Sequence, residues 1–171
     1  MKITEKTKSY SAYLNGSTYL GTAAIELPNL ESLSEVIKGA GIAGEINSPT
    51  IGHFGSLGMT INWRTVDPSA IRLAEPQLHA IDFRIASQTL DSANGQYSTD
   101  STKISVRAMP NGLTLGNLET ATQTGTSNTF EVNYIKIVIN GKVVLELDKL
   151  NSIYIVNGTD YLAAERAALG K

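Results

Sequence analysis

Apolar and polar residues alternate over much of this chain, which is the pattern of half-buried β-strands. The alternation is clearest in 131–148, where two apolar runs flank Asn140-Gly141 and predict a hairpin. A three-residue loop over 139–141, with Gly141 in a left-handed bulge position, pairs Val138 with Lys142. We predict this register because it gathers the apolar side chains on one face: Ile135, Ile137, Val143, Leu145 and Leu147. The opposite face then carries Lys136, Val138, Lys142, Val144, Glu146 and Asp148.

Other segments also have the alternation or composition of strands, namely 11–27, 58–65, 78–87 and 102–109. In the second of these, Trp63 follows Met59 and Ile61 on alternate positions, so the three side chains share one face. We interpret Trp63 as a core or interface anchor, with a sugar-stacking platform as the alternative.

The sequence predicts only short helices. Asp67 followed by Pro68 is the pattern of an N-cap and a first helical residue, and it predicts a helix over 68–75. Ser32 and Glu35 have the spacing of a capping box, which favours a turn or two of helix before Gly39. Near the C-terminus, Thr159 or Asp160 would cap an alanine-rich helix that ends at Gly170.

Two segments lack periodicity. Residues 39–58 contain six glycines and Pro49, and we expect a long irregular arm there. Residues 110–129 are rich in threonine and predict a polar loop. A third segment, residues 88–101, is also polar, and we interpret it as a connection between two strands. The fold class predicted from the residues is therefore mainly β, with one short internal helix and one C-terminal helix.

The arm contains Gly39-x-Gly41-x-x-Gly44, the glycine spacing of a dinucleotide-binding turn. That motif requires a strand before it and a helix after it, and the sequence predicts neither here. We interpret the glycines as allowing a sharp bend or a close backbone approach to another surface.

Composition narrows the function classes. Charged residues make up 18% of the chain, below the average of about 25%, so part of the surface is expected to be covered by other subunits. The net charge of −2 gives no basic field for sequence-reading nucleic-acid binding. The chain contains no cysteine, which excludes disulfides and thiolate metal sites. The N-terminus lacks an apolar signal segment, so we expect synthesis in the cytosol.

The sequence contains no set of residues with the types and spacing of a known catalytic site. His53 and His79 are too few and too scattered for a metal site. Glu146 and Asp148 have strand spacing, but they lie on the polar face of the predicted hairpin, where solvation accounts for them better than acid–base chemistry does. We predict no catalytic residue, no metal site and no cofactor.

The order of motifs resembles a known family. "AYLNGSTYLGTAAIELPNL", "KGAGIAGEI" and "SLGMTINWRT" resemble the N-terminal half of the major tail tube protein of contractile-tailed phages, the P2-like family. "NYIKIVINGKVVLELDKLNSIYIVNGTDYLAAERAALG" resembles its C-terminal half. The tube proteins of R-type bacteriocins are similar as well.

This resemblance implies one tail-tube domain over 1–171, built from two packed antiparallel sheets that form a β-sandwich or partial barrel. Subunits of the family join in six-fold rings whose sheets close a continuous inner β-barrel. Stacked rings form a hollow tube inside a sheath, with a baseplate and a tail terminator at its ends. The implied contents of the lumen are a tape measure protein and DNA, and the assembled tube contacts the membrane of the target cell.

The resemblance also implies roles for particular residues. The arm would reach adjacent subunits and the next ring through Gly39, Gly41, Ile42, Gly44, Ile46, Gly52 and Phe54. The polar face of the last hairpin, with Lys136, Lys142, Glu146 and Asp148, would line the lumen or lie on the outer surface.

Other function classes stay open at this point. A carbohydrate-binding β-sandwich would use Trp63 or the threonine-rich loop, and a hydrolase would use dispersed carboxylates. Within the resemblance, a phage tail and a bacteriocin share the same tube and are not separated by one subunit.

Overall fold

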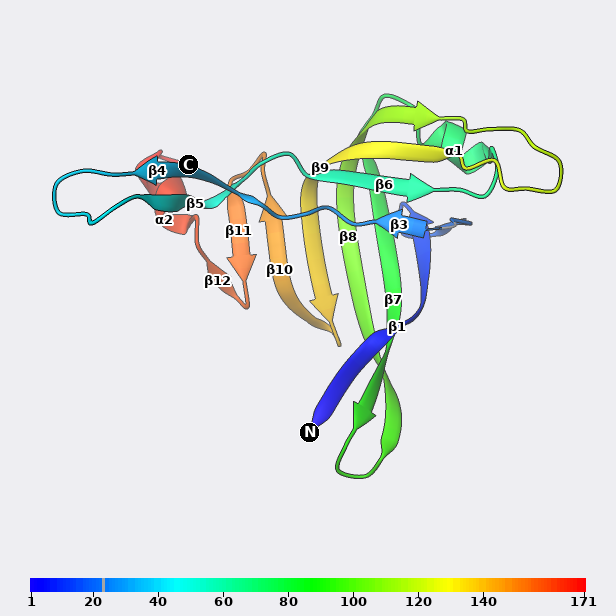
Figure 1. Cartoon of the computed structure of the whole chain (residues 1–171), viewed down its shortest axis with the longest axis horizontal. Coiled ribbons are helices and arrows are strands. Elements are labelled where there is room, and N and C mark those ends of the chain that lie inside the picture. The colour runs from blue at the N-terminus through cyan, green and yellow to red at the C-terminus, as the bar shows by residue number, and fades with distance from the viewer. Residues whose placement is uncertain (23) are drawn as a thin grey trace.

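Antiparallel strands form a large sheet and a separate two-stranded hairpin (Figure 1). The structure is a computed structural model that describes residues 1–22 and 24–171. Its elements are β1 (Lys2–Leu14), β2 (Thr18–Leu20), β3 (Ala24–Glu26), β4 (Ser32–Ile37), β5 (Ile46–Phe54), β6 (Gly58–Asn62), α1 (Pro68–Arg72), β7 (His79–Asp91), β8 (Gln96–Thr114), β9 (Ser127–Ile139), β10 (Lys142–Asp148), β11 (Ile153–Val156), β12 (Thr159–Asp160) and α2 (Ala163–Ala168). The prediction of a mainly β fold with two antiparallel sheets and two short helices is confirmed.

The large sheet runs in the order β12-β11-β10-β9-β8-β7-β1-β2. It bends back on itself because the first part of β9 pairs with β6, which in turn pairs with β3. A bulge between Arg107 and Ala108 interrupts the β8–β9 ladder near this bend. As a result, β3 and β6 lie across one face of the main sheet, as a second layer (Figure 1).

The hydrophobic core fills the space between these two layers. Alternate residues of neighbouring strands meet there, since Ile81 is opposite Val106, and Phe83 is opposite Ile104. Trp63 directly follows β6 and is buried among them. The predicted alternation of Met59, Ile61 and Trp63 toward one face is therefore confirmed.

Local chemistry explains α1. The Asp67 side chain accepts a hydrogen bond from the backbone N–H of Ser69 at 2.8 Å, and Pro68 occupies the first helical turn. The predicted start of this helix is confirmed. The C-terminal helix begins later than predicted, after Leu162, because Thr159 and Asp160 form β12 instead of a cap.

The last hairpin has the predicted core face but a different turn. Asn140 and Gly141 both have positive φ, and Lys142 pairs with Ile139, so the loop has two residues and the predicted three-residue loop is wrong. A register shift between Val143 and Leu145 then realigns the strands. Because of this bulge, Leu145 and Leu147 still face Ile137 and Ile135, whereas Val143 pairs with Val138 on the other side.

Four sequence predictions of irregular or helical structure are wrong. Residues 32–37 form strand β4 and not a helical turn, and the predicted irregular arm contains β5, which pairs with β4. Residues 110–114 continue β8, so the polar loop is shorter than predicted. The polar connection 88–101 forms the ends of β7 and β8 and the turn between them. In each case pairing with the next strand supplies hydrogen bonds that the composition of the segment alone does not predict.

Candidate assembly interface

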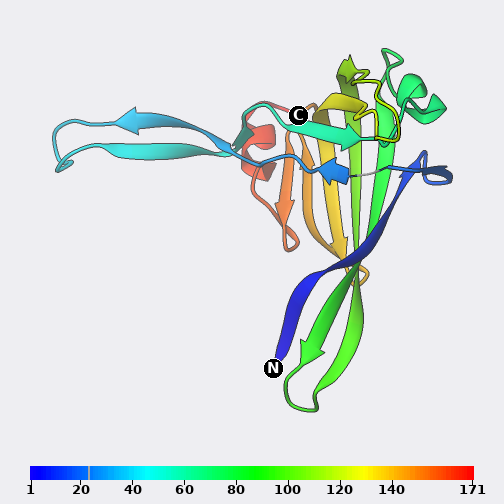
Figure 2. The ribbon, with the colours of Figure 1, turned by 45° about the vertical axis from the view of Figure 1, so that its right-hand side comes forward.

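The β4–β5 hairpin projects from the body of the molecule (Figure 2). Its turn contains Gly39, Gly41 and Gly44, all with positive φ, and an added Cβ at any of them would meet no atom within 4 Å. The N–H of Ile42 donates to the Gly39 carbonyl at 3.1 Å. These glycines therefore shape the turn itself, and their Cα atoms face open space in the single chain.

Both faces of this hairpin expose apolar side chains. Ile37 and Ile46 are directly opposite each other near the turn, and each has about half of its surface exposed (47% and 54%). Val36 and Ile51 are also exposed. Clustered exposed hydrophobic residues on a projecting element mark an interaction site.

The root of the hairpin is fixed to the C-terminal part of the chain. The Phe54 ring makes an edge contact with Tyr154 of β11, with centroids 5.1 Å apart. His53 Nε2 lies 3.0 Å from a carboxylate oxygen of Glu165 in α2. A Cβ at Gly52 would lie 2.6 Å from Leu162 Cδ2, so the backbone approaches α2 closely. The residues predicted for the arm thus divide into a distal turn, with Gly39, Gly41, Ile42, Gly44 and Ile46, and a root, with Gly52 and Phe54.

The main strand order of the large sheet ends in two open strands. β2 lies at one end of this order and β12 at the other, and each pairs with a single neighbour along it. Off this path, β3 also pairs with a single neighbour, β6. The backbone groups on the outer side of an edge strand are available for pairing with another chain. β12 and the hairpin lie at the same end of the molecule in Figure 1, while β1 and β3 lie at the opposite end.

The main sheet has a polar face opposite the core. Lys136 and Glu146 share this face, as predicted, but they are directly opposite each other only because of the register shift. Lys103 Nζ lies 3.6 Å from Asp82 Oδ2. The Tyr134 hydroxyl donates to Glu146 at 3.0 Å. Burial, followed by this hydrogen bond to Glu146, raises the pKa of Tyr134 to about 12, so the phenol stays neutral at physiological pH.

Arginine residues on this face stack on tyrosines. The Arg84 guanidinium lies 4.3 Å from the Tyr13 ring centroid, and Arg107 lies 4.9 Å from the Tyr134 ring centroid.

Of the other predicted polar-face residues, Lys142 adjoins the β9–β10 turn. Asp148 is buried, and its carboxylate accepts from the backbone N–H groups of Leu150 and Asn151 at 3.0 Å. Asp148 therefore stabilises a turn.

Trp63 does not fit the alternative of a sugar-stacking platform. Trp63 is 2% exposed and its indole faces the core, so it offers no ring face to a sugar. Among residues 1–22 and 24–171, no group of three or more His, Asp or Glu side chains could hold a metal ion. The same residues contain no helix with the length and apolar character needed to cross a bilayer.

Comparison with known proteins decides the family. The family model for phage tail tube protein FII matches residues 4–170. The chain belongs to this family. It is a tail tube protein, and it shares 25% identity over 175 residues with the tail tube protein of Escherichia phage P2, covering 99% of both chains. The family is structural, and the alternative of a carbohydrate-binding module is not favoured.

Solved structures share the fold of this tail tube protein. The sheath/tube terminator of the extracellular contractile injection system PVC, in its extended state, superposes with a TM-score of 0.51 at 14% identity, over 77% of this chain and 94% of that chain. A chain of the PVC sheath–tube complex in the extended state has a TM-score of 0.50 at 11% identity, over 75% and 87% of the two chains. The β architecture is thus common to phage tail tubes and a phage-like injection system.

Proposed function

We propose that this chain is the subunit of the inner tube of a contractile phage tail or a phage-tail-like bacteriocin. Residues 1–171 form one tube domain that assembles into six-fold rings, and the rings stack into a hollow conduit. The sheath surrounds this tube, and a baseplate and a tail terminator close its ends. On sheath contraction the tube is driven through the envelope of the target cell.

The observation that carries this proposal is the pair of open edges, β2 and β12, at opposite ends of one curved sheet in a tail tube protein. When the β12 edge of one subunit meets the β2 edge of the next, a closed ring satisfies both edges of every subunit. Such head-to-tail contacts form a ring when the rotation between subunits closes. The low content of charged residues, 18%, supports extensive coverage of the surface by sister subunits.

In this assembly the polar face of the main sheet lines the lumen. Several of its positive charges lie next to carboxylates or on aromatic rings, namely Lys103 beside Asp82, Arg84 over Tyr13 and Arg107 over Tyr134. A wall whose charges are balanced locally offers a polyanion few unpaired cations to bind, so DNA or a tape measure protein passes without sticking. Lys136 and Glu146 lie near the middle of this wall.

Two measurements test the proposal. Electron microscopy of the purified protein, with baseplate components supplied as a nucleus, is expected to show rings or tubes. A Lys136→Cys variant, in a chain with no other cysteine, is then treated with a small maleimide and with a maleimide on a long polyethylene glycol chain.

The expected result depends on the size of the reagent. Both reagents modify the monomer, but only the small one modifies assembled tubes quickly, because the long polymer is excluded from the lumen. Equal modification of monomer and tube by the large reagent would place Lys136 on the outer surface. A dispersed monomer under all conditions contradicts the whole proposal.

A further inference from the structure

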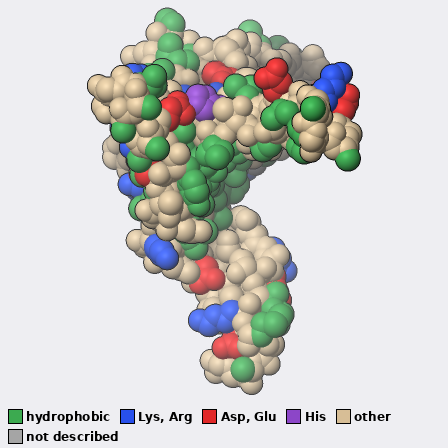
Figure 3. All heavy atoms as spheres, turned by 90° about the vertical axis from the view of Figure 1, so that its left-hand side faces the viewer, with side chains coloured by type: hydrophobic (Ala, Val, Ile, Leu, Met, Phe, Trp, Pro, Cys, Tyr) green, Lys and Arg blue, Asp and Glu red, His purple; other side chains and the backbone are tan. Residues whose placement is uncertain are grey.

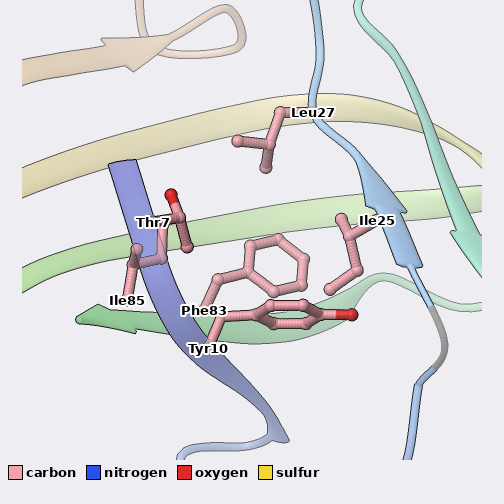
Figure 4. A pocket seen from close by; sticks show the side chains of 6 residues that line it. All are labelled: Thr7, Tyr10, Ile25, Leu27, Phe83 and Ile85. Atoms are coloured by element: carbon pink, nitrogen blue, oxygen red, sulfur yellow. The ribbon is translucent and has the colours of Figure 1, made fainter. Parts of the chain in front are cut away.

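An apolar pocket lies on the core side of the sheet, at the end that carries β1, β2 and β3 (Figure 4). It has a volume of about 150 Å³, and in Figure 4 its side chains converge from β1, β7 and the β3 region. Its lining residues are Thr7, Tyr10, Ile25, Leu27, Phe83 and Ile85. An apolar cavity of this size holds a group as large as benzene, so one isoleucine side chain fits in it.

The β4–β5 hairpin supplies apolar side chains of that size at the opposite end of the molecule. Its strands continue directly from β3 and into β6, so the hairpin extends the second layer beyond the β12 end of the main sheet (Figures 1 and 2). Ile37 and Ile46 lie side by side near its tip, and both are exposed. Figure 3, which views this end of the molecule, shows hydrophobic side chains in the hollow below this layer.

Ring closure brings the hairpin and the pocket together. The β12 end of one subunit then adjoins the β2 end of the next, and the hairpin projects past β12 in the same direction. It therefore extends over the neighbouring sheet at its β1–β3 end, in the layer to which β3 belongs. The lining residue Ile25 lies on β3, so the neighbouring pocket opens beside that layer.

Charge complementarity favours the same partner. Glu35 lies on the hairpin face that carries Ile37 and Ile46, because it is two residues from Ile37 on β4. The groove that adjoins the pocket shares Thr7 and Tyr10 with it and is also lined by Lys8 and Arg64. Lys38 and Glu45 at the tip lie 3.6 Å apart and balance each other, which leaves Glu35 to face Lys8 and Arg64 beside the pocket.

We propose that the Ile37–Ile46 tip of one subunit docks in this pocket of the adjacent subunit in the same ring and places one isoleucine side chain between Tyr10 and Ile85. This inference rests on the proposed function, since it needs the ring. It assigns the hairpin to a lateral contact and identifies the surface that receives it.

Disulfide trapping tests the contact, because the natural chain has no cysteine to interfere. The variant carries Ile37→Cys at the hairpin tip and Leu27→Cys at the rim of the pocket, where both residues are exposed. Within one chain these positions cannot bond, because the chain runs outward from β3 along the whole of β4 (Figure 2). β4 alone spans about 16 Å, whereas disulfides join Cα atoms less than about 7 Å apart. Any disulfide between them therefore joins two subunits.

The matched control pairs Ile37→Cys with Ile139→Cys, which is as exposed as Leu27 but lies at the β9–β10 turn. After oxidation of assembled tubes, the test pair is expected to give a ladder on a non-reducing gel that stops at six chains. The control pair and the single-cysteine variants should remain mainly monomeric under denaturing conditions. Reduction should collapse the ladder.

Each other outcome overturns the inference. Tubes that form but show no more cross-linking than the control exclude this pocket while leaving the proposed function intact. A ladder that continues beyond six chains shows docking between stacked rings instead of within one ring. Failure of the unmodified chain to form rings removes both the inference and the proposed function, and electron microscopy of that chain detects it.

Discussion

The indole Nε1–H of Trp63 donates a hydrogen bond of 2.8 Å to Oδ1 of Asn128, and both side chains are buried. The Asn128 amide in turn donates to the carbonyl of Ala70 at 3.0 Å. One polar pair inside the apolar core thus joins the end of β6, the start of β9 and helix α1. Because both groups are out of contact with water, neither can lose its partner without cost.

Trp63→Phe is expected to destabilise the monomer by about 1–3 kcal/mol, because the buried side-chain oxygen Oδ1 of Asn128 then lacks a hydrogen-bond donor. Urea unfolding of the unassembled protein measures the change. The matched control is Tyr97→Phe at an exposed tyrosine, which should stay within about 0.5 kcal/mol of the natural chain. Equal stability of the two variants would show that the hydrogen bond contributes nothing.

Gly41→Val is expected to impair assembly more than folding. Gly41 has φ of +88°, and a residue with a Cβ in the left-handed region costs about 1–2 kcal/mol. The strain falls on the hairpin turn, outside the core, so urea unfolding of the body should change little. Light scattering should show reduced tube formation, whereas Ala40→Val in the same turn serves as the control. Unchanged assembly of the Gly41→Val variant would refute this role of the turn.

Gly52→Ala is expected to loosen the attachment of α2. The new Cβ would lie 2.6 Å from Leu162 Cδ2, and displacing a packed side chain costs about 1–3 kcal/mol. Amide hydrogen exchange over 159–169 should become faster. Gly95→Ala is the control, because Gly95 also has positive φ but an added Cβ there meets nothing within 4 Å. If both variants change exchange in this segment equally, contact with Leu162 is not the cause.

Glu131 is expected to make the fold sensitive to acid. Burial raises the pKa of this carboxyl, but hydrogen bonds from Ser56 and the backbone N–H of Leu57, with the nearby Lys149 ammonium, outweigh it and hold the pKa below the ordinary value of 4.5. A carboxyl with a lowered folded-state pKa stabilises the native state fully above the ordinary value. That stabilisation is lost as the pH falls through the folded-state pKa.

Unfolding free energies measured as the pH is lowered from neutrality to below 4.5 test this role. The natural chain should lose stability more steeply than Glu131→Gln, which cannot ionise. Glu119→Gln, at an exposed position of the polar loop, is the control and should follow the natural chain. Parallel curves for the natural chain and Glu131→Gln would exclude a contribution from this carboxylate.

Features with a local cause could be predicted from sequence. The start of α1 follows from Asp67 and Pro68, whose cap and fixed φ act within a few residues. The core face of the last hairpin follows from the alternation of Ile135, Ile137, Leu145 and Leu147. In the candidate interface, the motif order indicated the family, and the glycines of 39–44 correctly marked a sharp turn on a projecting segment.

Features that depend on distant partners could not be predicted. Residues 32–37 have helix-capping chemistry, but they pair with β5, with one irregularity between Ser32 and Ser34, and they form a strand. The polar residues 96–101 and 110–114 become strand because they pair with β7 and β9. The exposed apolar tip and the pocket at the other end of the sheet also became visible only in three dimensions.

The sequence by itself determined the mainly β class of fold, most of the core positions and the helix start, because side-chain periodicity and capping act over a few residues. The class of protein was indicated by the resemblance of its motifs to a known family. The tertiary structure decided which strands pair, where bulges correct the register and which edges stay open. The physical reason is that backbone hydrogen bonds between strands depend little on side-chain identity. Their partners are chosen by the packing of the whole chain, and at β2 and β12 the available edges extend that choice to a second molecule.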